Sequence, residues 1–285
     1  MRNNFPRMKK VLKTCFRIFV GVILGHFLLS LFLPSCLFFP VKEVEQSTFP
    51  HEDVYFNAPN GLKLNGWYVP PKEDYPTIIF SHGNGGNIGY FFNMLIPVAE
   101  KGYGIFIYDY EGYGNSEGFS TEKKMYNDLR SAVNYINTEK GTPDNDIILW
   151  GLSIGGAVTT KIATEGDFKA VILQNTFTNI KDAAKELIKT KTKIPCLENI
   201  AHICVYFYKF DTYSRIDKIE EPTFIISSKD DELIRYVLAE KNYAKCKNAK
   251  LKIVEQDSHN TYFMILPEIM KYLDENVTAK KQIGE

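Results

Sequence analysis

The stretch Ile147–Ala163, "IILWGLSIGGAVTTKIA", places Ser153 between glycines at both second neighbours and adds a further glycine after them. Glycine accepts backbone angles and close contacts that a Cβ forbids. A β-branched and aromatic run precedes the serine, and small residues follow it. We therefore expect a buried strand, a turn too tight for larger residues, and a helix that begins directly after Ser153.

The same alternation runs through the rest of the chain. Short apolar runs ("TIIF", "GIFIYDY", "DIILWG", "AVILQN", "PTFIISS", "LKIVEQ") alternate with amphipathic stretches such as Thr121–Glu139 and Glu232–Cys246. This pattern predicts an α/β fold with a mostly parallel central sheet and helices on both faces. Earlier in the chain, two strand-like pieces flank "PNG" at 59–61, which indicates a hairpin. Ligands of such sheets bind at the carboxyl ends of the strands.

Composition narrows the possible partners. The chain has 285 residues, 45% of them hydrophobic, and 34 basic side chains balance 34 acidic ones, so nothing favours binding to nucleic acid. The five cysteines show no CxxC pair and no metal spacing with histidine, so we expect no metal site.

The N-terminus has the pattern of a membrane anchor. Residues 1–17 carry six basic side chains and no acidic one, and Ile18–Phe39 is an uncharged apolar run of 22 residues. A helix of that length crosses a bilayer of roughly 30 Å. We expect a transmembrane signal-anchor helix at 18–39 with the N-terminus cytoplasmic and residues 40–285 on the non-cytoplasmic side. A cleaved signal peptide ending near "LPSC" is the alternative.

One segment interrupts the alternation of strands and helices. More than forty residues separate "ILQNTF" from the strand at Pro222, too many for a plain connection. We expect a helical cap insertion at 176–220 within the 40–285 domain. Its aromatic segment "VYFYKF" either lines an acyl pocket, faces a membrane, or packs the cap.

The residues around Ser153 suggest nucleophilic catalysis. Gly151, Ser153 and Gly155 match G-x-S-x-G, which occurs where a strand turns sharply into a helix and lifts a serine hydroxyl above the sheet. A serine hydroxyl needs a base and a group that orients the base. Among the five histidines, His259 directly follows the last predicted strand, so it is the candidate base; we expect His82 to brace its own loop.

The acid should lie between serine and histidine in the chain. "FIISSKDDELI" offers Asp230 and Asp231 at the end of another strand. We favour Asp231 because the following "ELI" resembles the turn that leads from such an acid into the next helix. Charge on a substrate oxygen also needs fixed donors. Ile154 supplies one backbone N–H, and the loop "FSHGNGGNIG" supplies the other through Asn84.

Taken together, "SHGNGGNIG", "YDYEGYGNSEG", "GLSIGGAVT", "QNTFTNI", "KDDELI" and "SHN" occur in the order and spacing of the α/β-hydrolase superfamily. The chain is most similar to the membrane-anchored serine hydrolases called abhydrolase domain-containing proteins. The resemblance implies Ser153 as nucleophile, Asp231 as acid, His259 as base, and oxyanion donors at Asn84 and Ile154. Glu111 departs from the pattern, since an arginine is usual at its position.

The resemblance implies a membrane-anchored hydrolase that cleaves an ester or thioester through an acyl-enzyme, without metal or organic cofactor. Tethering at a bilayer favours a small lipid-like or acylated-protein substrate. Two alternatives remain open: a serine peptidase of the same fold, and a non-catalytic membrane scaffold.

Overall fold

The computed structural model describes residues 17, 21, 25, 37–191 and 208–278. The chain divides into two compact units, Met1–Phe38 and Phe39–Glu285. In the described part, no helix is both long and apolar enough to cross a membrane. The predicted span at 18–39 lies almost wholly outside the described residues. Its last residue, Phe39, belongs to the second unit.

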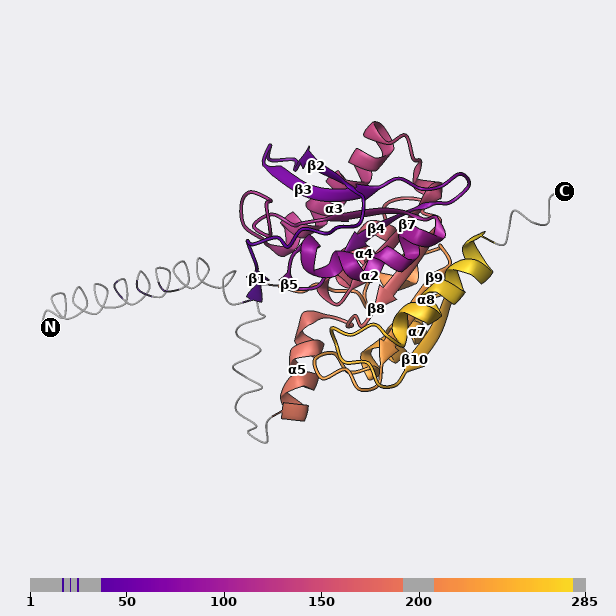
Figure 1. The fold of residues 1–285 in the computed structure, drawn as a ribbon. Coiled ribbons are helices and arrows are strands. Elements are labelled where there is room, and N and C mark those ends of the chain that lie inside the picture. The colour runs from indigo at the N-terminus through magenta and orange to yellow at the C-terminus, as the bar shows by residue number, and fades with distance from the viewer. Residues whose placement is uncertain (1–16, 18–20, 22–24, 26–36, 192–207, 279–285) are drawn as a thin grey trace, which may run out of the picture. The chain divides into compact units, whose positions relative to one another are not determined.

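The second unit is built on an eight-stranded sheet in the order β10-β9-β8-β7-β4-β6-β3-β2 (Figure 1). Parallel pairing joins β4, β6, β7, β8, β9 and β10, so the predicted mostly parallel sheet is confirmed. The strands are β2 (Glu52–Asn57), β3 (Lys63–Val69), β4 (Thr77–Ser81), β6 (Gly104–Tyr108), β7 (Ile147–Leu152), β8 (Ala170–Gln174), β9 (Thr223–Ser228) and β10 (Ala249–Val254).

The predicted hairpin forms the antiparallel edge of the sheet. Strand β2 pairs with β3 from Glu52↔Tyr68 to Asn57↔Lys63, and β3 pairs antiparallel with β6. Residues "PNG" make the turn between β2 and β3, and Gly61 occupies it with a φ of 83°. The hairpin is therefore placed as the sequence predicts.

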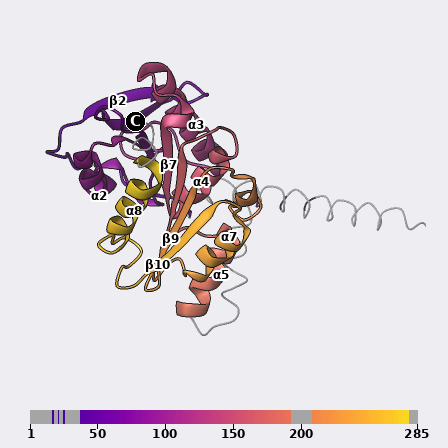
Figure 2. The same cartoon turned by 90° about the vertical axis from the view of Figure 1, so that its right-hand side faces the viewer.

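Helices cover both faces of the sheet (Figure 2). On one face lie α2 (Ile88–Lys101) and α8 (Ile265–Leu273), whose apolar sides share a buried cluster with the sheet. On the other lie α3 (Glu122–Glu139), α4 (Ile154–Ala163) and α7 (Val237–Lys245). Most central strands are buried along their whole length, which explains their uninterrupted apolar sequences.

The structure departs from the sequence prediction at two elements. Helix α7 begins at Val237, not at Glu232, because a side-chain-capped turn occupies the residues after Asp231. A second, two-stranded sheet joins β1 (Phe39–Pro40) to β5 (Gly85–Gly86) in parallel. Of the predicted cap at 176–220, the structure describes α5 (Ile180–Lys191) and the short helix η2 (Ile216–Lys218); residues 192–207 lie outside the description.

Candidate active site

Ser153 sits in the strained turn between β7 and α4. Its φ of 56° and ψ of −119° lie in a region that residues with a side chain rarely adopt. A Cβ at Gly155 would overlap the carbonyl oxygen of Ser81, and a Cβ at Gly151 would overlap that of Gly155. The glycines flanking Ser153 thus let α4 press against the end of β4, which answers why the sequence surrounds this serine with them.

Neighbouring strands hold the turn by its backbone. The amide of Ser153 donates to the carbonyl of Gln174, 2.9 Å away at the end of β8. The hydroxyl of Thr176 donates to the carbonyl of Ser153 at 2.7 Å. The conformation of Ser153 is therefore fixed from both of its peptide groups, and a strained φ persists only where surrounding structure imposes it.

Asp231 follows β9 and contacts the candidate base. Its Oδ2 lies 2.7 Å from Nδ1 of His259, and both residues are buried, with 6% and 7% of their surface exposed. Its Oδ1 accepts hydrogen bonds from the amides of Leu233 and Ile234 at 2.8 and 2.7 Å. The carboxylate is thus fixed at both oxygens, with one of them aimed at the imidazole.

The neighbouring Asp230 is used differently. Its side chain is exposed, and its Oδ2 accepts a hydrogen bond from the amide of Gln256 at 2.7 Å. That contact ties the β9 loop to the β10 loop. Of the two aspartates that the sequence leaves open, the structure brings Asp231 to His259.

His259 lies in the loop after β10, and several contacts fix its backbone. Its amide donates to Oε2 of Glu232 at 3.1 Å. Asp257, two residues earlier, accepts from the amides of Met264 and Ile265 at 2.8 and 2.9 Å and so caps the first turn of α8. Because a carboxylate only accepts hydrogen bonds, Nδ1 of His259 carries a proton and Nε2 is left as the basic nitrogen.

Asn175 is a site residue to which the sequence analysis gave no role. It follows β8 with a φ of 46°, and asparagine tolerates that conformation better than most residues. Its Oδ1 accepts from the amide of Ser228 at 3.0 Å, and its Nδ2 donates to the carbonyl of His259 at 3.4 Å. The sequence signal for a role of Asn175 was its place directly after the apolar run of β8, the strand that pairs with β7. Asn175 links the ends of β8 and β9 to the loop that carries the base.

The loop after β4 brings Asn84 close to the serine. A Cβ placed on Gly83 would lie 3.7 Å from the Cβ of Ser153, so this glycine borders the serine directly. The carbonyl of Gly83 lies 2.8 Å from Nδ1 of His82 and can only accept, so Nδ1 donates. In a trans peptide the C=O and the following N–H point in opposite directions. The contact from His82 therefore sets the direction of the Asn84 N–H.

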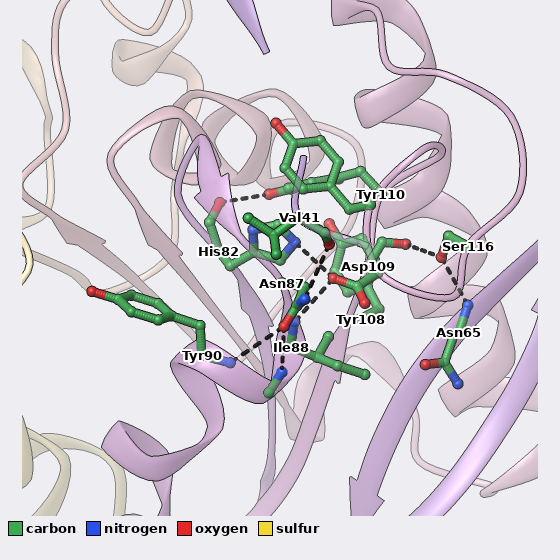
Figure 3. Close-up of polar contacts among 12 residues, drawn as sticks. Val41, Asn65, His82, Asn87, Ile88, Tyr90, Tyr108, Asp109, Tyr110 and Ser116 are labelled. Atoms are coloured by element: carbon green, nitrogen blue, oxygen red, sulfur yellow. Dashed lines mark hydrogen bonds and ion pairs between the residues drawn. The ribbon is translucent and has the colours of Figure 1, made fainter. Parts of the chain in front are cut away.

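His82 has the bracing position expected for it. It is fully buried, and its Nε2 lies 3.4 Å from Oδ1 of Asp109 (Figure 3). The same carboxylate oxygen accepts from the amide of Ile88 at 3.0 Å, at the start of α2. Burial raises the pKa of Asp109 above its usual range. This pair connects the ends of β4 and β6. It is a separate contact from the one between Asp231 and His259.

Ile154 is the first residue of α4, and its amide is one of the four at a helix N-terminus without an acceptor inside the helix. It directly follows Ser153 and is buried. The first amide of α4 and the loop carrying Asn84 therefore both lie beside the serine.

Glu111, the departure noted in the sequence, is a buried structural contact. Its Oε1 accepts from Nδ2 of Asn60 at 2.9 Å, and its Oε2 lies 2.8 Å from Nζ of Lys124. Its amide donates to Oδ2 of Asp128 at 2.9 Å, and burial raises the pKa of Asp128 well above its usual range. Glu111 thus joins the β2–β3 turn to α3.

The described part of "VYFYKF" packs against the domain. Tyr208 and Phe210 are buried, and the ring of Phe210 lies 6.0 Å from that of Tyr126 on α3. Glu122 accepts from the amides of Lys209 and Phe210 at 2.6 and 2.9 Å, which pins the returning chain to the start of α3. Tyr208 and Phe210 therefore take part in packing against the start of α3. Among the described residues, no group of three His, Cys, Asp or Glu is placed to hold a metal ion.

Residues 72–204 match the family model described as "Serine aminopeptidase, S33". The chain is 27% identical to YfhR of Escherichia coli K12, over 90% of this chain and 89% of that protein. It is 28% identical to the alpha/beta hydrolase domain-containing protein WAV2 of Arabidopsis thaliana, over 82% of each. It is 29% identical to the Saccharomyces cerevisiae membrane protein YNL320W, over 74% of each.

Solved structures share the fold. Esterase Pf2001 of Pyrococcus furiosus superposes with a TM-score of 0.67 at 20% identity, over 85% of this chain and 98% of that one. Est1E of Butyrivibrio proteoclasticus, solved with ferulic acid, gives a TM-score of 0.64 at 21% identity, over 81% of this chain and all of that one. The chain therefore has the fold of the α/β hydrolases and resembles members of that superfamily in sequence.

Proposed function

We propose that the protein is a serine hydrolase that cleaves carboxylic esters or thioesters through an acyl-enzyme. The observation that carries the proposal is the 2.7 Å contact between Asp231 and His259, at the same sheet edge as the strained turn of Ser153. A nucleophile, a base and a group that orients the base are the minimum set for this chemistry.

In the acylation step, Oγ of Ser153 bonds to the acyl carbon while Nε2 of His259 takes the hydroxyl proton. Asp231 keeps the imidazole in the correct tautomer and stabilises its positive charge. The tetrahedral intermediate collapses, the bond to the leaving alcohol or thiol breaks, and that leaving group receives the proton. Water then repeats the sequence on the acyl-enzyme and releases the acid.

The oxyanion of each tetrahedral intermediate is stabilised by the amides of Asn84 and Ile154. One donor of this kind contributes about 10² to 10³ in kcat. The border between Gly83 and Ser153 and the start of α4 at Ile154 support this assignment. Because both donors are backbone groups, their placement depends on how firmly the two segments are held.

The substrate class is a lipid-like ester or an acylated protein. Ester cleavage is supported by the structural similarity to Pf2001, which is an esterase. The lipid-like character rests on the expected anchor at 18–39, which would hold the site beside a bilayer. The name of the yeast relative, a membrane protein, supports the anchor. Residues 40–285 then lie on the non-cytoplasmic side, and protection of this domain from protease added to sealed vesicles tests that orientation.

A serine peptidase is the second candidate, because the matching family model is described as a serine aminopeptidase. A peptidase would use the same three residues, so the site geometry does not favour the ester over the peptide. A non-catalytic scaffold is the third reading, and the contact between Asp231 and His259 weighs against it.

Parallel assays on three classes of substrate separate these candidates. Purified full-length protein would be assayed with acyl p-nitrophenyl esters, the matched acyl thioesters and aminoacyl anilides, each beside Ser153→Ala. Turnover of esters or thioesters by the wild type, but not by Ser153→Ala, supports the proposal. Turnover of the anilides alone would assign a peptidase, and turnover unchanged in Ser153→Ala would refute a serine mechanism.

A further inference from the structure

The last residue of the predicted membrane span and the residues after it are hydrogen-bonded to the loop that carries Asn84. We call residues 39–45 the connector. The amide of Phe39 donates to the carbonyl of Asn84, and the amide of Val41 donates to that of Gly86, both at 3.3 Å. These contacts form the two-stranded parallel pair of β1 and β5 (Figure 1).

Backbone groups make this pairing, since the side chains of Phe39 and Val41 are 60% and 47% exposed. The carbonyl of Val41 also accepts from the amide of Gly114 at 3.0 Å, and Nζ of Lys42 donates to the carbonyl of Ser116 at 3.0 Å. The connector is thus held between the loop after β4 and the loop after β6.

Asn87 ties the connector to the start of α2 (Figure 3). Its Nδ2 donates to the carbonyls of Val41 and Glu43 at 3.0 and 2.7 Å. Its Oδ1 accepts from the amides of Gly89 and Tyr90 at 3.1 and 3.4 Å, which caps the helix. One side chain therefore does two separable jobs, with its oxygen on the helix and its nitrogen on the connector.

We propose that the connector is a positioning element for the oxyanion donor at Asn84; this inference rests on the proposed serine hydrolase function. Two peptide groups flank Asn84. His82 holds the first through the carbonyl of Gly83, and Phe39 and Tyr113 hold the second through the carbonyl of Asn84, the tyrosine hydroxyl at 3.0 Å. With both planes fixed, the direction of the Asn84 N–H is fixed as well.

The proposal gives the connector a role in catalysis. Its amides hold the carbonyls of Asn84 and Gly86. Preorganised donors stabilise charge because they need no reorganisation during the reaction. A loosened connector therefore slows acylation and weakens oxyanion binding, whereas ground-state substrate binding changes little.

The test uses Asn87→Ser in the full-length protein. Serine is a good helix N-cap, so the variant keeps the cap and loses both donors to the connector. We expect kcat/KM for an acyl p-nitrophenyl ester to fall about 10-fold, less than the 10² to 10³ that removal of one oxyanion donor costs, because the donor is loosened and not removed. The inhibition constant of a trifluoromethyl ketone, whose adduct carries an oxyanion, should rise by the same factor, with KM nearly unchanged.

A matched control separates this effect from general loosening. Asn137 on α3 donates its Nδ2 to the carbonyl of Thr142 at 2.8 Å and to Asp144 at 3.0 Å, so Asn137→Ser also removes two donors. It should leave kcat/KM and inhibitor affinity at the wild-type level. A second variant, Asn87→Asp, keeps the size and the cap but turns the donor into an acceptor facing two carbonyls. Asn87→Asp should lower kcat/KM and inhibitor affinity more than Asn87→Ser does.

Wild-type kcat/KM and inhibitor affinity in both Asn87 variants would overturn the proposal. So would a loss of thermal stability with kcat/KM lowered but inhibitor affinity unchanged, because that pattern describes structural damage only. Failure of the proposed function is read separately, from absent turnover in the wild type. In that case, hydrogen exchange of the peptide spanning 82–88 still decides the coupling: faster exchange in Asn87→Ser than in Asn137→Ser supports it, and equal exchange refutes it.

Discussion

Nδ1 of His259 lies 2.7 Å from Oδ2 of Asp231, although 28 residues separate the two in the chain. They meet because β9 and β10 are parallel neighbours, so the loops that follow them leave the same edge of the sheet. Both loops are fixed by further contacts, with Asp230 bound to the amide of Gln256 and Asp257 capping α8. The relationship gives the two adjacent aspartates different expected roles.

Replacing each aspartate in turn tests this difference. Asp231→Asn should lower kcat by about 10⁴-fold, because an amide beside Nδ1 favours the wrong imidazole tautomer. Asp230→Asn should leave kcat near wild type, since Asn Oδ1 still accepts from the amide of Gln256. Steady-state kinetics on one ester measures both variants, and a larger loss in Asp230→Asn would mean that the roles are reversed.

Asn175 should affect catalysis through the position of His259. Asn175→Gly keeps a residue suited to the φ of 46° and removes the hydrogen bonds to Ser228 and His259. We expect a loss of about 1–3 kcal/mol of unfolding free energy. We also expect kcat to fall by up to about 100-fold if the base shifts by about 1 Å.

Asn242→Ala is the control for Asn175→Gly. Buried Asn242 on α7 donates Nδ2 to the carbonyl of Phe177 at 3.2 Å, so its loss should destabilise the protein similarly without slowing turnover. Denaturant unfolding and kcat would be measured on both variants. An equal drop in kcat for both would show that Asn175 acts only through stability.

The partly buried pair of Glu111 and Lys124 should behave as a coupled unit. Lys124→Met leaves the carboxylate of Glu111 without its cation and should lower the free energy of unfolding by about 1–3 kcal/mol. This loss is smaller than for a fully buried pair because the Lys124 side chain is 23% exposed. Adding Glu111→Gln should recover part of that loss. A double-mutant cycle by denaturant unfolding measures the coupling, and additive losses would contradict it.

Asp128 should make stability depend on pH with a defined sign. Burial raises its folded-state pKa well above the unfolded value, so the charged form is disfavoured in the folded protein. The contribution of Asp128 to folding stability is therefore least favourable at high pH, and it improves as the pH falls through the folded-state pKa. Asp128→Asn should stabilise the protein at pH 8, with a gain that shrinks toward pH 5.

Exposed Asp167 supplies the matching substitution for Asp128. Asp167→Asn should change stability little at either pH. Thermal unfolding of both variants across this range measures the difference. A gain for Asp128→Asn that grows as pH falls would contradict the expected sign.

Much of the fold follows from local pattern. The six predicted strands, the hairpin around Gly61 and the helix after Thr121 appear where the sequence places them, because apolar periodicity and turn residues act locally. The start of α7 was misplaced since Asp231 Oδ1 caps a turn over Leu233 and Ile234, a tertiary consequence of holding the carboxylate for His259.

Site residues were predictable where spacing and chemistry coincide. Ser153 and His259 stand out by their neighbours and by their place after strands. Asn175 does not, because its role depends on the adjacency of β8, β9 and the His259 loop. The β1–β5 pairing was equally hidden: Phe39 ends an apolar run, and nothing local shows that its amide reaches Asn84.

The most direct test of the central claim is fluorophosphonate labelling of detergent-solubilised wild type beside Ser153→Ala. A fluorophosphonate reacts with a serine hydroxyl that a base activates and whose oxyanion is stabilised. We expect rapid labelling of the wild type and none of the variant, with the adduct placed by mass spectrometry on the peptide containing Ser153. Equal labelling of both proteins, or no labelling of folded wild type, would contradict it.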